Sequence, residues 1–87
     1  MTKDQLVNAL KEAVGGTPYG DMLVDEAAET YGDKDKKYGQ GMKDRLDDRL
    51  GILKAYERIH KDAGQEAKAT TEAEKIAIVE KALAALK

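Results

Sequence analysis

The stretch MKDRLDDRLGILKAYERIHKDAG, residues 42–64, carries the longest helical pattern in the chain. Its apolar residues recur every three or four positions, as side chains on one face of a helix do: Met42, Leu46, Leu50, Leu53, Tyr56 and Ile59. Because Ile52, Ile59 and Ala63 extend it on one side, and at about 100° per residue, this face covers close to half of the helix circumference. A face that wide is typical of a helix packed between two others. We therefore expect a long central helix over 42–63.

Shorter helical patterns lie on both sides of this segment. Thr2 and Gln5 form a capping-box pattern, which predicts a helix over 3–14 that ends at two consecutive glycines. Thr17 followed by Pro18 predicts the start of a second helix over 18–31, because proline fits the first position of a helix. A second capping-box pattern at 71–74 predicts a final helix over 71–86.

No segment alternates polar and apolar residues over the length of a strand. We therefore expect an all-α fold, a compact bundle of two short N-terminal helices, one long central helix and one C-terminal helix. The 87 residues fit a single domain over 1–87, with a loop at 32–41. A chain this short builds a thin core, so a homodimer or a bound partner would add stability that the core does not supply.

The composition excludes several classes of function. The chain contains no Cys, no Ser and one His, so thiol and serine nucleophiles, disulfides and cysteine-based zinc sites are excluded. We expect no catalysis and no cofactor. Charged residues make up 37% of the chain with a net charge of −2, which differs from the basic excess of a nucleic-acid-binding protein. There is no apolar run of about 20 residues, so we expect a cytoplasmic protein with no membrane partner.

The Gly-, Asp- and Lys-rich segment at 33–41 resembles a ligand-binding loop only superficially. Asp33 and Asp35 match the first ligands of an EF-hand, but Lys37 takes the place of the third and Tyr38 that of the required glycine. The glycines at 39 and 41 match neither a P-loop nor a dinucleotide fingerprint. We interpret the segment as a connector in which Tyr38 is a candidate protein contact. The basic residues between 34 and 49 leave a nucleic-acid accessory protein as a second alternative.

The one pattern with metal-binding chemistry is Glu57-Arg58-Ile59-His60. In helical bundles, Glu-x-x-His places both side chains on the face that points into the bundle. Glu26 falls on the apolar face of its own helix, so Glu57, His60 and Glu26 are the ligands if a metal site exists. Because a di-iron site needs two such motifs and the chain has one His, we expect no metal, and a metal-binding bundle is the first alternative.

The function that remains is a small soluble protein-binding or regulatory module. Its partner would be another protein, of unknown identity, or a second copy of the chain. The contact surfaces would be helix faces and the 33–41 loop, because wide apolar faces and exposed loops are common in protein contacts. The candidate contact residues are Tyr38, Arg45, Arg49, Tyr56 and Ile78.

Overall fold

The computed structural model describes residues 2–31 and 38–86, with the backbone alone at 30, 31, 38 and 39. The helices are α1 (Lys3–Val14), α2 (Pro18–Glu26), α3 (Tyr38–Asp62) and α4 (Glu66–Ala85), and a π-helical turn, η1 (Ala27–Tyr31), extends α2. No strand occurs in the described part of the chain. The predicted all-α bundle of four helices is therefore confirmed. Among the described residues, no helix is both long enough and apolar enough to cross a bilayer.

The first two helices begin where their capping residues predict. At α1, the Thr2 hydroxyl accepts a hydrogen bond from the Gln5 N–H at 3.2 Å, and the Gln5 side chain accepts one from the Thr2 N–H at 2.9 Å. At α2, the Thr17 hydroxyl accepts the Gly20 N–H at 3.1 Å. These side chains pair N–H groups that have no partner within the helix, so each one fixes the residue at which its helix starts.

The predicted loop at 32–41 is wrong at its C-terminal end, because α3 begins at Tyr38. Glycine costs a helix about 1 kcal/mol relative to alanine, which was the reason to end the loop after Gly41. Two interactions offset that cost. Met42 and Leu46 are fully buried, and the Gln40 side chain donates a hydrogen bond to Asp44 one turn later, at 2.8 Å. The rest of the predicted loop, 32–37, lies outside the described residues.

The predicted start of the last helix is also wrong, because α4 begins at Glu66 and not near Thr71. Thr71 lies inside the helix, where its hydroxyl donates a hydrogen bond to the Ala67 carbonyl at 3.1 Å. The residues before it are mostly good helix formers, and Ala69 among them is buried. A capping-box pattern inside a longer helix is therefore not a start signal.

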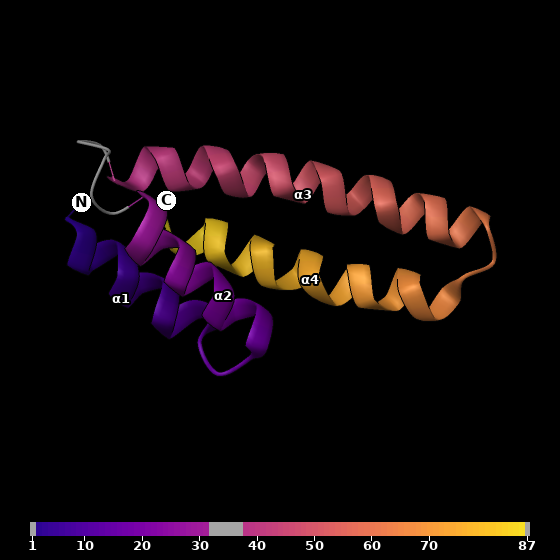
Figure 1. The fold of residues 1–87 in the computed structure, drawn as a ribbon, viewed down its shortest axis with the longest axis horizontal. Helices are drawn as coiled ribbons and strands as arrows, with labels where there is room; N and C mark the ends of the chain where they lie inside the picture. The colour runs from indigo at the N-terminus through magenta and orange to yellow at the C-terminus, as the bar shows by residue number, and fades with distance from the viewer. Residues whose placement is uncertain (1, 32–37, 87) are drawn as a thin grey trace.

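The helices form a long hairpin with a shorter pair packed at one end (Figure 1). Helices α3 and α4 run antiparallel, and α1 and α2 lie against the end that is remote from the α3–α4 turn. The molecule measures 43 × 23 × 20 Å, so it is about twice as long as it is wide. Gly64 allows the tight turn between α3 and α4, because it adopts a φ of +74° that side chains disfavour.

The hydrophobic core occupies the end of the hairpin that α1 and α2 cover. Its fully buried side chains are Leu6, Leu10, Leu23, Met42, Leu46 and Val79. Along α3, the last buried residue is Leu53. We call residues 54–75 the distal hairpin. Ala69 is the one buried residue in it. About half of the α3–α4 hairpin therefore extends past the core as a pair of helices with almost no buried apolar side chain.

Candidate protein-binding surface

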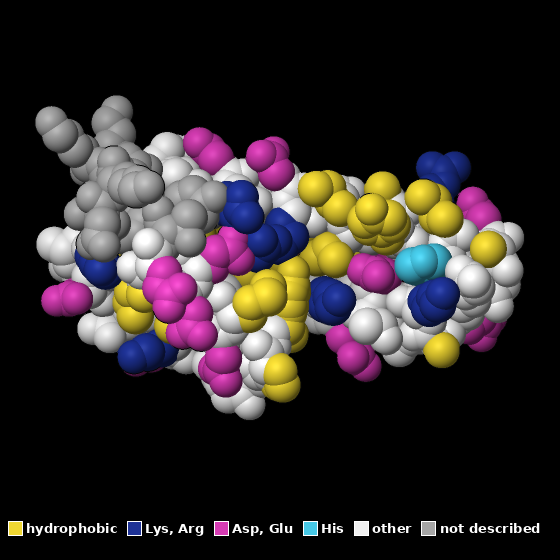
Figure 2. Space-filling model, viewed as in Figure 1, with side chains coloured by type: hydrophobic (Ala, Val, Ile, Leu, Met, Phe, Trp, Pro, Cys, Tyr) yellow, Lys and Arg dark blue, Asp and Glu magenta, His cyan; other side chains and the backbone are white. Residues whose placement is uncertain are grey.

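Three large apolar side chains lie exposed along one flank of α3. Ile52, Tyr56 and Ile59 expose 55%, 51% and 57% of their surface. They follow one another at spacings of four and three residues, so they form a single line along the helix, which we call the α3 strip. Figure 2 shows hydrophobic side chains gathered along α3 beyond the region that α1 and α2 cover. Such a line is an unpaired helix face.

The sequence predicted that α3 packs between two helices along its whole apolar face. That prediction holds for the proximal half, where the core cluster contains residues of α1, α2, α3 and α4. It is wrong for the distal half, because α1 and α2 are too short to reach it. At about 1.5 Å per residue, the 25 residues of α3 are roughly twice as long as the 12 residues of α1. Tyr56 and Ile59 therefore have no helix above them.

A cluster of one carboxylate and two guanidinium groups links the last residue of α2 to α3. Arg49 donates two hydrogen bonds to the two oxygens of Glu26, both at 2.8 Å, and Arg45 donates a third. The side chains of Glu26 and Arg49 are 14% and 20% exposed. Arg45 and Arg49 are predicted contact residues, and in the structure both side chains bind Glu26 of the chain's own α2. Sequence periodicity did not identify Glu26 as their common acceptor.

The electrostatics of this cluster favour the ion pair. Burial alone raises the pKa of the Glu26 carboxyl, but the hydrogen bonds and positive charges of Arg49 and Arg45 outweigh burial, so the pKa lies below its usual value. The hydrogen bond to Glu26 likewise raises the pKa of Arg49. All three groups therefore stay charged at neutral pH, and they hold α2 against α3.

An open groove of about 380 Å³ connects this cluster to the α3 strip. Arg49 forms part of one wall, Tyr56 forms another, and Lys75 of α4 completes the border. The Lys75 ammonium lies 5.5 Å from the ring centroid of Tyr19, a cation–π distance. Burial raises the pKa of the Tyr19 hydroxyl, against a smaller opposite effect of Arg49, so this phenol stays neutral at ordinary pH. The groove thus joins aromatic surface to cationic side chains.

The structure does not bring together the three residues named as ligands for the case of a metal site. Glu26 is held by the two arginines, and the His60 ring stacks on Tyr56 with the ring centroids 6.3 Å apart. The His60 Nδ1 atom is buried and has no hydrogen-bond partner among the described residues. Within the same residues, no three His, Cys, Asp or Glu side chains lie close enough together to hold a metal ion.

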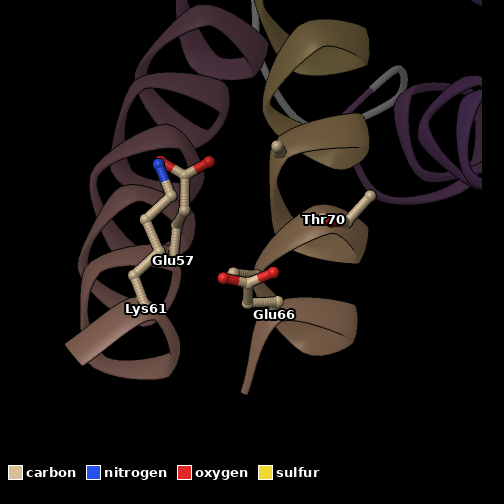
Figure 3. A pocket seen from close by; sticks show the side chains of 6 residues that line it. Glu57, Lys61, Glu66 and Thr70 are labelled. Carbon is tan, nitrogen blue, oxygen red and sulfur yellow. The ribbon is translucent and has the colours of Figure 1, made fainter. Parts of the chain in front are cut away.

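Glu57 lies in a separate hollow between the two helices of the distal hairpin. The hollow measures about 500 Å³ and is open to solvent. Figure 3 shows Glu57 and Lys61 on α3, with Glu66 and Thr70 across the gap on α4. Glu57, Lys61 and Glu66 line this hollow, where a packed hairpin would place apolar side chains. The distal hairpin is therefore loosely packed on this side as well.

The other predicted contact residues are less available. Ile78 is partly buried against the core and lines a third hollow beside Tyr19. The side chain of Tyr38 and the residues at 33–37 lie outside the described part of the chain. Of the predicted contact set, Tyr56 is the large apolar side chain that lies exposed in the α3 strip. Ile52 and Ile59 were missed as contacts, although their position at the edge of the apolar face was a usable signal.

Comparison with known protein families, curated proteins and solved structures finds no match to this chain.

Proposed function

We propose that this chain is a small non-catalytic protein-binding module that accepts a partner helix along the α3 strip. The observation that carries the proposal is the exposure of Ile52, Tyr56 and Ile59 in the α3 strip, beside a distal hairpin in which Ala69 alone is buried. Helices in proteins gain most of their stability from packing an apolar face against other elements. A two-helix extension with its apolar side chains exposed gains that packing when a further helix covers it.

The shape of the surface favours a helix as the bound element. Side chains spaced by four and three residues form a straight ridge, into which the ridges of another helix fit. Tyr56 lies at the centre of the strip and presents a large ring with few rotatable bonds, which suits an anchor residue. The groove beside it is bordered by Lys75, by Glu72 and by Arg49, which Glu26 already pairs, so charges of both signs would favour a partner helix with polar side chains along that edge.

The residue types in the chain support a non-catalytic function. The sequence supplies no Cys or Ser nucleophile, and its single His is stacked on Tyr56. The metal-binding alternative lacks an assembled ligand set among the described residues. The nucleic-acid alternative relied on cations between 34 and 49. Of these, Arg45 and Arg49 bind the carboxylate of Glu26, and the lysines at 34–37 lie outside the described residues.

The test compares the proteins captured by wild type with those captured by two variants that each gain one carboxylate. Ile59→Glu places a charge in the strip, whereas Ala77→Glu places one on an exposed site of α4 that the groove does not include. Wild-type protein and both variants are immobilised and exposed to lysate of the cells that make the chain, and bound proteins are quantified by mass spectrometry. Circular dichroism checks that both variants stay helical.

We expect wild type and Ala77→Glu to retain the same proteins, the chain itself included, and Ile59→Glu to lose them. Equal retention by all three proteins, or no retention above a blank surface, would contradict the proposal.

A further inference from the structure

We propose that the distal hairpin opens and closes as one unit while the core stays folded. In the open form, residues 54–62 of α3 and 66–75 of α4 lose their helical structure together, and both helices stay intact on the core side of Leu53 and Ile76. Three features support this opening: the place where burial ends on each helix, the side chains that lie between the helices, and the dependence of each segment on the other.

Burial ends at matching positions on the two helices of the hairpin. Leu53 of α3 and Ile76 of α4 are 7% and 8% exposed, and both belong to the core cluster. Between them in sequence, Ala69 is the one buried residue, and its side chain is a single methyl group. Opening the hairpin as far as Leu53 and Ile76 therefore exposes little apolar surface, whereas opening the core exposes its large buried side chains.

The side chains between the two helices stabilise the closed form only weakly. Glu57, Lys61 and Glu66 line the hollow of about 500 Å³, which is open to solvent (Figure 3). Charges that water reaches contribute little to stability, because they are solvated whether the helices are packed or apart. The closed form also buries the His60 Nδ1 atom without a hydrogen-bond partner among the described residues. Opening returns that atom to water, so it removes a desolvation cost.

The two segments open together because each depends on the other. They contain nine residues of α3 and ten residues of α4. Adding a residue to an existing helix in water is close to neutral in free energy, so segments of this length gain little stability from their own hydrogen bonds. Within the described part of the chain, α1 and α2 lie at the other end of the hairpin, so each distal segment packs on the other (Figure 1). When one segment melts, the other loses its packing surface.

The opening divides the α3 strip. Tyr56 and Ile59 lie in the part that opens, whereas Ile52 lies next to Leu53 and stays helical. The complete strip is therefore present only in the closed form. The effect on binding rests on the proposed function: a partner helix that needs the whole strip binds with an affinity reduced by the closed fraction, and its binding shifts the hairpin toward the closed form.

Glycine substitutions on the two sides of the boundary test the opening by amide hydrogen exchange. Ala73 and Ala77 are exposed residues of α4 one turn apart, and Ile76 separates them. Ala73 lies in the distal hairpin, so Ala73→Gly should speed the exchange of residues 54–62 on the other helix about fivefold, the factor that corresponds to about 1 kcal/mol of helix propensity. Position 77 stays helical in the open form, so Ala77→Gly should leave that exchange within about twofold of wild type.

Two results would overturn the inference. Unchanged exchange of residues 54–62 in Ala73→Gly would show that the two helices do not open together. Equal acceleration by Ala73→Gly and Ala77→Gly would show that exchange in the distal hairpin requires unfolding of the whole chain. Neither result changes what Ile59→Glu does to capture from lysate, so failure of the opening and failure of the proposed function are distinguishable.

Discussion

Removing the charge of Glu26 tests how α2 is held against α3. In Glu26→Gln, the carboxylate that accepts two hydrogen bonds from Arg49 and one from Arg45 becomes a neutral amide. Hydrogen bonds to charged groups contribute about 1.5–3 kcal/mol each, and breaking one side leaves the part-buried Arg49 without its counter-charge. Arg45 is about half exposed, so its share is small. Because Gln keeps one acceptor oxygen, we expect a loss of about 2 kcal/mol.

This loss is large for a chain of 87 residues. Small domains have a free energy of unfolding of about 5 kcal/mol, and 1 kcal/mol shifts Tm by about 4–8 °C at this size. Urea unfolding followed by circular dichroism gives the change directly. The control is Asp25→Asn, which removes an exposed carboxylate from the same helix and should change stability by less than about 0.5 kcal/mol. Equal effects of the two substitutions would refute the role of the ion pair.

The pH dependence of the same pair has a defined sign. The pKa of Glu26 is lower in the folded state than its ordinary value of 4.5, so the unfolded chain binds more protons near that pH. The contribution of Glu26 is therefore complete above the unfolded pKa and is lost as the pH falls through the folded pKa. The difference in unfolding free energy between wild type and Glu26→Gln should be constant near neutral pH and should shrink below about pH 4.5. A difference that grows on acidification would contradict this account.

Substitutions at three further positions test local structure by urea unfolding. Gly51→Ala should stabilise the chain by about 1 kcal/mol, because the added Cβ meets nothing within 4 Å on an exposed face of α3; destabilisation would contradict this. Gly20→Ala should destabilise by about 1–3 kcal/mol or more, since its Cβ would lie 1.8 Å from the Val14 carbonyl oxygen; an unchanged midpoint would refute that close approach. Thr17→Ala should lower the free energy of unfolding by about 1 kcal/mol, because it removes the hydroxyl that caps α2. Thr17→Ser keeps that hydroxyl and should lower it much less; equal losses would contradict the role of the cap.

The helix content could be read from the sequence because local signals specify it. Thr2 and Thr17 cap the helices that they precede. Gly64 adopts the positive φ that the turn between α3 and α4 requires. The errors arose where packing overrode a local signal. Met42 and Leu46 extend α3 through two glycines, and Thr71 lies inside α4 although its neighbours match a capping box.

The candidate surface could be only partly predicted, for a different reason. Periodicity shows which side chains of α3 are apolar, but it does not show how far α1 and α2 reach along that helix. Tyr56 was identified as a contact, whereas Ile52 and Ile59 were expected to extend a covered face. In the same way, spacing showed that Glu26 faces inward, but its two arginine partners lie about 20 residues further along the chain and became apparent only in the fold.

Amide hydrogen exchange along α3 tests most directly the claim that the distal hairpin is left incomplete. The measurement compares residues 42–53 with residues 54–62 at the lowest protein concentration that detection allows. We predict fast exchange in 54–62, because opening there exposes almost no buried surface. Protection of 54–62 equal to that of 42–53 at the lowest concentration would contradict the claim.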